Sequence, residues 1–134
     1  MTLRANQLLT AARLVLERDD LGGFANRARG AALLARQSIE TALAAYWREV
    51  APGAERASRK AQFVSLRYCL GDARLAASAH QAWAELSSAC HHHPYDIAPT
   101  ATEVLHWIEA TAPVISALTA ATDDATDDAT HSHP

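Results

Sequence analysis

The chain has 134 residues, of which 49% are hydrophobic, with 5 glycines, 5 prolines and a formal net charge of −3. This length suits one domain with a substantial core, and good helix formers, above all alanine, dominate the composition. No continuous apolar run approaches the roughly 20 residues of a membrane span, and residues 1–7 lack the pattern of a secretory signal. We therefore expect an all-α, cytoplasmic protein with no membrane partner.

The hydrophobic spacing predicts an up-and-down helical bundle of four to five helices. The expected helices cover residues 3–19, 25–50, 58–70, 73–92 and 100 onward. The second helix is the longest, and its small apolar residues between Ala28 and Ala42 predict close contact with a neighbouring helix.

Capping side chains support three of the helix starts. Ser58 and Asp72 are expected to cap the third and fourth helices, and Thr100 forms a capping box with Glu103 at the start of the fifth. Pro113 should kink or split this last helix, because proline lacks the N–H that the helix needs.

The C-terminal residues differ from the rest in composition. From Ala121 the chain reads Ala-Thr-Asp-Asp-Ala-Thr-Asp-Asp-Ala-Thr, an acidic repeat with little to bury. Such a segment is expected to be disordered. We therefore predict a bundle over residues 1–120 and a disordered acidic tail over residues 121–134.

The charges are divided along the chain. All 12 Lys and Arg residues lie at or before Arg74, whereas the last 60 residues carry 8 acidic residues and no Lys or Arg. Such an asymmetry indicates an anion-binding half. Alternatively, basic and acidic helices pack side by side and neutralise each other.

Two cysteines and three tryptophans are expected to serve the core. If the third and fourth helices form a hairpin, Cys69 and Cys90 lie about 27 Å apart, too far for a disulfide. We expect both to be buried thiols in a reducing compartment. Trp47, Trp83 and Trp107 lie on apolar stripes, which favours core positions over base-stacking platforms.

Residues able to do chemistry are concentrated at the end of the fourth helix, where His91, His92 and His93 precede Pro94. Successive helical side chains diverge by about 100°, so the three imidazoles cannot bind one metal ion, and His80 is about 16 Å away. We therefore expect no metal and no cofactor, with a site formed by Cys90 and one of the histidines as the weaker alternative. Imidazoles also suit a helix C-terminus, where they cap free carbonyls, but three exceed what capping needs.

Two further pairs of residues are candidates for catalysis or phosphate binding. Ser87 and His91 are one helical turn apart, but no acidic residue at helical spacing orients the histidine for nucleophilic catalysis. Arg67 and Arg74 flank the expected turn between the third and fourth helices, where they either hold a phosphate or pair with Asp72.

Two segments resemble HEPN domains. Residues 31–45 (AALLARQSIETALAA) resemble their alanine-rich second helix, and residues 83–91 resemble the segment in which an aromatic residue precedes Leu-Ser and then a histidine. The resemblance spans about residues 8–118 and implies a helical bundle that forms a homodimer. It also implies a metal-independent endoribonuclease of the toxin–antitoxin or defence type, since many HEPN domains cut RNA in this way.

The HEPN signature is an arginine followed, after four to six residues, by a histidine. The resemblance implies that the histidine acts as general acid or base on the ribose 2′-OH, while the arginine stabilises the phosphate charge. In this chain Leu86, Glu85 and Ala84 occupy the places before His91 where the arginine would lie.

The arginine would therefore have to come from elsewhere. Arg74 and His80 match the spacing, but on an unbroken helix they point about 120° apart, which favours coincidence. Arg29, Arg36 and Arg67 are alternative sources, from the same chain or from a second subunit.

Two functions remain open. The first is RNA or nucleotide binding, with weak or no cleavage, in which His91, His92 and Ser87 are the catalytic candidates. The expected ligand-binding residues are His93, Tyr95, Arg29, Arg36, Arg67, Arg74 and His80. The second is a non-catalytic protein-interaction or dimerisation module, whose partner is a second copy or an antitoxin-like protein.

Overall fold

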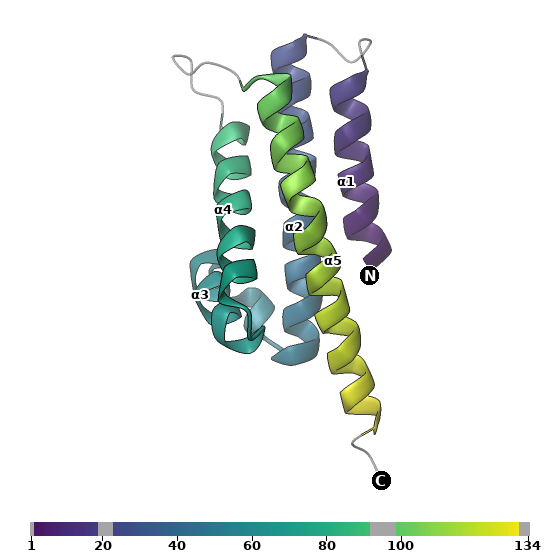
Figure 1. Cartoon of the computed structure of the whole chain (residues 1–134), viewed down its shortest axis with the longest axis vertical. Helices are drawn as coiled ribbons and strands as arrows, with labels where there is room; N and C mark the ends of the chain where they lie inside the picture. Colours follow the sequence, from purple (N-terminus) through teal and green to yellow (C-terminus); the bar gives the residue numbers. More distant parts are fainter. Residues whose placement is uncertain (1, 19–22, 92–98, 132–134) are drawn as a thin grey trace.

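The computed structural model describes residues 2–18, 23–91 and 99–131 (Figure 1). Among these residues it contains five α-helices, one short 3₁₀ helix and no strand, which confirms the predicted all-α helical bundle. The α-helices are α1 (Thr2–Glu17), α2 (Phe24–Val50), α3 (Arg59–Cys69), α4 (Ala73–Cys90) and α5 (Ala101–His131), and the 3₁₀ helix η1 covers Ala54–Arg56.

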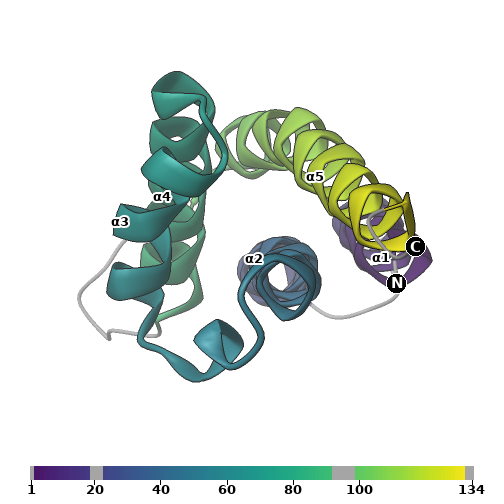
Figure 2. The ribbon, with the colours of Figure 1, turned by 90° about the horizontal axis from the view of Figure 1, so that it is seen from below.

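Four long helices, α1, α2, α4 and α5, run up and down in turn (Figure 1). α2 is central, because it contacts α1, α4 and α5 as well as η1. The short α3 packs against α4 at the end of the bundle where α2 ends and α4 begins (Figures 1 and 2). This end therefore gathers side chains that lie far apart in the sequence.

The core forms around α2, whose inward face carries small residues as predicted. Ala28, Ala32 and Ala35 are fully buried, which lets neighbouring helices approach closely. Larger buried side chains fill the remaining space: Ile39, Leu43, Trp47, Leu66, Leu86, Ile108, Ile115 and Leu118. Each contributes about 1.5–3 kcal/mol through burial. Of the three tryptophans, Trp47 is buried as expected, whereas Trp83 and Trp107 are half-buried at the edge of the core.

The predicted helix caps are confirmed. Ser58 Oγ accepts a hydrogen bond from the backbone N–H of residue 61 at 3.2 Å, and Asp72 Oδ1 accepts one from residue 75 at 3.0 Å. Thr100 and Glu103 exchange two bonds of 3.1 Å, which completes the capping box. Gly71 adopts a φ of 71° in the turn before α4, a backbone conformation that residues other than glycine disfavour.

α5 continues through Pro113 as one helix, so the expected split does not occur. Proline supplies no N–H to the carbonyl of Glu109, one turn earlier. Pro113 is exposed, so water can reach this part of the helix. Within the helix, the hydroxyl of Thr111 donates to the carbonyl of Trp107 at 2.7 Å.

The acidic segment begins within α5, which extends to His131, and the disorder of residues 121–134 stays a prediction. Ala121 packs against the core and ties the start of the tail to the bundle. The hydroxyl of Thr122 donates to the carbonyl of Leu118 at 2.7 Å, and that of Thr126 donates to the carbonyl of Thr122 at 3.0 Å. The helix therefore crosses residue 120 without a break.

α5 also bears on the membrane prediction. Over Ala101–Asp128 it is long and apolar enough to cross a membrane by length and composition, with a mean hydropathy of 1.3. A core helix of a folded bundle meets the same criterion. α5 is such a helix, since it packs Val104, Ile108 and Val114 into the core. The absence of a membrane partner and the cytoplasmic location stay predictions.

Replacing Pro113 tests how α5 tolerates proline. Pro113→Ala supplies the missing N–H and removes the ring, so we expect the free energy of unfolding to rise by about 1–3 kcal/mol. Urea denaturation followed by circular dichroism measures this change. Ser116→Ala, at an exposed position on the same helix, serves as the control and should change stability by less than about 0.5 kcal/mol. A less stable Pro113→Ala variant would contradict the account of α5.

Candidate functional site

The structure places part of the predicted histidine segment. α4 ends at Cys90, two residues earlier than expected, and His91 is its C-cap, with an N–H that donates to the carbonyl of Ser88 at 3.3 Å. The side chain of His91 is exposed. His92, His93 and Tyr95 lie outside the described residues. Of the three consecutive histidines, the structure thus describes only His91, whose imidazole is exposed at the end of α4.

Ser87 lies on the inner side of α4. Its Oγ atom is buried and has no hydrogen-bond partner among the described residues. No hydrogen bond therefore joins Ser87 to His91, so the structure does not assemble the serine–histidine pair that the spacing allowed.

Arg36 is the one predicted arginine that the structure brings to the end of α4. Burial raises the pKa of the Cys90 thiol above its ordinary value, while the positive charge of Arg36 lowers it and the negative charge of Glu40 raises it. Both side chains on α2 therefore lie close to Cys90. His91 follows Cys90 in the chain, but no hydrogen bond or ion pair within the described residues joins its exposed side chain to Arg36, so a cation beside the terminal imidazole stays a prediction.

The other predicted ligand-binding residues are dispersed. Arg74 lines a groove between α4 and α5, whereas His80 stacks on Phe63 of α3 with ring centroids 4.8 Å apart. The two residues therefore do not form a pair, which agrees with their angular separation on the helix. Arg67 is exposed on α3 and Arg29 is half-buried on α2. Neither makes a hydrogen bond or ion pair with the described part of the chain.

The cysteines differ in part from their prediction. Cys69 is exposed, so the prediction that this thiol is buried is wrong; Cys69 is the last residue of α3 and lies at the turn that leads to α4. Cys90 is half-buried, and both thiols are free. Among the described residues, no group of three or more His, Cys, Asp or Glu side chains is close enough to hold a metal ion.

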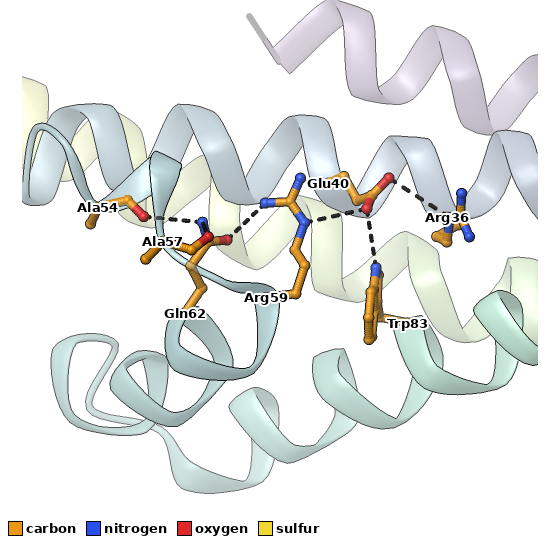
Figure 3. Close-up of polar contacts among 7 residues, drawn as sticks. All are labelled: Arg36, Glu40, Ala54, Ala57, Arg59, Gln62 and Trp83. Atoms are coloured by element: carbon orange, nitrogen blue, oxygen red, sulfur yellow. Dashed lines mark hydrogen bonds and ion pairs between the residues drawn. The ribbon is translucent and has the colours of Figure 1, made fainter.

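Glu40 is the centre of a polar network between α2, α3 and α4 (Figure 3). Its carboxylate lies 3.3 Å from Arg59 Nε and 3.8 Å from Arg36 Nε. Trp83 Nε1 donates to the same carboxylate at 3.3 Å. The Arg36 and Arg59 guanidinium groups share one carboxylate, so the cluster retains a positive charge.

Gln62 fixes the position of Arg59 within this network (Figure 3). It is only 2% exposed. Its Oε1 accepts from Arg59 Nη1 at 2.8 Å, and its Nε2 donates to the carbonyls of Ala54 and Ala57, both at 3.0 Å. A buried amide with all of these bonds satisfied is rigid. The Arg59 guanidinium is therefore held in place before any ligand arrives.

Arg59 also belongs to a groove of about 460 Å³ on the surface between α1, α2 and the start of α3. We call it the arginine groove, and its lining residues are Arg4, Leu8, Gln37, Glu40, Thr41, Ala44, Ala45, Arg48 and Arg59. Three guanidinium groups face one carboxylate, which leaves two positive charges in excess. The volume falls within the usual range for small-ligand sites.

Arg4, Arg48 and Arg59 are not among the residues expected from the sequence. Arg4 and Leu8 are one turn apart on one helix, and Thr41 and Arg48 are seven residues apart on another, so each pair shares a helix side. The spacing of these residues can be found in the sequence. It does not predict the groove, because the sequence of one helix does not show which side of another helix it will contact.

A second groove, of about 440 Å³, lies between α4 and α5. Its basic side chains, Arg74 and His106, are accompanied by the carboxylates of Asp72 and Glu85. With as many acidic as basic side chains, it attracts anions less than the arginine groove does. We therefore take the arginine groove, together with the Glu40 network, as the candidate functional site.

Comparison of the chain with known protein families, with curated proteins and with solved structures finds no match. The resemblance to HEPN domains thus stays an expectation based on two short sequence segments. The function has to be argued from the geometry and charge of the site.

Glu40→Gln tests the network. The substitution leaves Arg36 and Arg59 close together without their shared negative charge. The three side chains are 24–31% exposed, so water screens part of the effect, and we expect a loss of about 1–3 kcal/mol in the free energy of unfolding. Glu49→Gln, at an exposed position on the same helix, is the matched control and should cost less than about 0.5 kcal/mol. Equal effects of the two substitutions in urea denaturation would show that Glu40 has no special role.

Proposed function

We propose that the protein binds single-stranded RNA or a nucleotide through phosphate groups held in the arginine groove. The observation that carries the proposal is the meeting of Arg4, Arg48 and Arg59, from three helices, around a single carboxylate. Guanidinium groups bind phosphate oxygens in pairs of parallel hydrogen bonds, which makes arginine well suited to this role.

The three arginines contribute in different ways. Arg59 is fixed by Glu40 and Gln62, so binding loses little of its side-chain freedom. Arg4 and Arg48 are exposed and make no hydrogen bond within the described residues, so their donors are available to a ligand. Arg4 also lies in the first turn of α1, where the helix dipole adds positive potential. The site thus combines one rigid and two adaptable cations.

RNA cleavage is a narrower proposal than RNA binding. What supports it is the position of Arg36 near Cys90, directly before His91, since Arg36 would stabilise phosphate charge and His91 would transfer a proton. Arg36 already interacts with Glu40 at 3.8 Å, which reduces its attraction for phosphate. We therefore propose binding with slow or no cleavage.

A protein-interaction module is the second candidate function, and a specific surface favours it. Val64 and Tyr68 lie one turn apart on α3 and are 51% and 81% exposed. An apolar pair of this kind fits a partner protein or a second copy in a homodimer. Salt separates the two functions, because RNA binding through arginines weakens steeply as salt rises and an apolar contact does not.

Arg4→Gln combined with Arg48→Gln tests the binding proposal. We expect the affinity for a labelled single-stranded RNA, measured by fluorescence anisotropy, to fall at least about tenfold. The slope of log affinity against log salt should decrease by roughly 1–2, since two phosphate contacts are lost. The control is Arg67→Gln with Arg74→Gln, which removes the same charge outside the groove. An equal loss in the control would show a general attraction for the basic half rather than binding in the groove.

His91→Ala combined with His92→Ala tests the cleavage proposal. If the histidines provide the acid or base, the double variant loses any cleavage of a labelled RNA while its affinity changes by less than about threefold. The assay is run with a chelator present, because the proposed reaction needs no metal ion. Cleavage at an unchanged rate would remove the histidines from the mechanism.

A further inference from the structure

The last turns of α5 carry four exposed carboxylates at the end of the bundle that holds the arginine groove. These are Asp123, Asp124, Asp127 and Asp128. Figure 1 shows that α5 extends beyond the other helices at this end. Acidic residues here are unfavourable for the helix itself, because the C-terminal end of a helix already carries negative potential.

Repulsion between neighbours adds to this cost. Asp123 and Asp127 are four residues apart on the helix, as are Asp124 and Asp128, and like charges at this spacing destabilise a helix. Local preference therefore opposes this arrangement of charges. A sequence that departs from local preference in this way indicates a role for the charges beyond folding.

The structure connects these carboxylates to the arginine groove through α2. A groove of about 320 Å³ lies between α2 and the end of α5, and its charged lining residues are Arg48 and Glu49 of α2 and Asp123 of α5. Ala45 and Arg48 line this groove and the arginine groove alike. Arg48 thus lies between the two grooves, with the carboxylate of Asp123 in one groove and the proposed phosphate site in the other.

We propose that the acidic end of α5 competes with bound RNA for Arg48 and so limits the affinity of the arginine groove. The inference rests on the proposed function and adds its regulation. Because coupling between two binding events is reciprocal, RNA that engages Arg48 withdraws a cation from the end of α5. Occupied protein should therefore open its last α5 turns more readily than free protein does.

The size of the effect follows from the charges involved. At separations of roughly 8 Å in water, removal of one like charge changes affinity about twofold, and salt reduces this further. Neutralising Asp123 and Asp127 together should therefore tighten RNA binding about two- to threefold at roughly 50 mM salt. The gain should fade at about 0.5 M salt, where the charges are screened.

A pair of matched variants tests the proposal. Asp123→Asn with Asp127→Asn neutralises the side of α5 that includes the groove-lining Asp123, and Asp124→Asn with Asp128→Asn removes the same charge one position further along the helix. The probe is a fluorescein-labelled single-stranded RNA of about ten nucleotides, and its affinity for the full chain is measured by anisotropy. We expect the gain of about two- to threefold in the first variant and less than about 1.5-fold in the second.

A second readout is hydrogen exchange of the backbone amides of residues 121–128. Saturation with RNA should speed their exchange in the wild-type chain, but not in the variant with Asp123→Asn and Asp127→Asn. This measurement detects the competition directly, whereas the affinity alone reports only charge.

The outcomes separate this inference from the proposed function. If wild-type protein binds RNA but the first variant gains nothing, or both variants gain equally, competition at Arg48 is wrong and RNA binding still stands. If wild-type protein binds no RNA, both proposals fall. A salt-sensitive dimer that disappears in the first variant would place the acidic end in the groove of a second copy, which contradicts competition within one chain.

Discussion

The arrangement of the candidate site depends on one carboxylate. Glu40 lies on the central helix α2 and is shared by the guanidinium groups of Arg36 and Arg59 and by the indole of Trp83. It thereby joins α2 to α3 and α4. Two cations around one anion leave the cluster positive. The contact that holds the helices together thus also lies beside the groove in which we propose an anionic ligand binds.

From this centre the positive charge extends in two directions. Arg36 lies toward Cys90 and the end of α4, where the exposed His91 is located. Arg59 lies in the arginine groove with Arg4 and Arg48. Beyond Arg48 the charge reverses at the end of α5. Basic and acidic residues, which are separated along the sequence, are thus also separated in the structure, and Arg48 lies between them.

The charge asymmetry of the sequence has different outcomes in different parts of the structure. Arg13 pairs with Glu109 at 3.4 Å between α1 and α5, so there a basic and an acidic helix do neutralise each other. In the arginine groove they do not. Sequence alone left both alternatives open, because neutralisation depends on which helix sides meet.

Local features of the sequence predicted the fold well. The caps at Ser58, Asp72 and Thr100 need only neighbours in the chain, and buried alanines along α2 follow a simple spacing. The exposure of Cys69 and the groove around Arg48 could not be predicted in this way, because both depend on the packing of separate helices. The start of the acidic segment lies in α5 because Ala121 packs against the core, whereas disorder of the tail stays a prediction from its composition.

The most direct test of the account is a map of the RNA contact on the protein. Backbone amide signals of the ¹⁵N-labelled chain, followed by NMR as a short single-stranded RNA is added, report which residues sense the ligand. The account predicts that the largest shifts occur near Arg4, along α2 from Gln37 to Arg48, and at Arg59. Shifts confined to the end of α4 around His91, or no shifts at all, would contradict it.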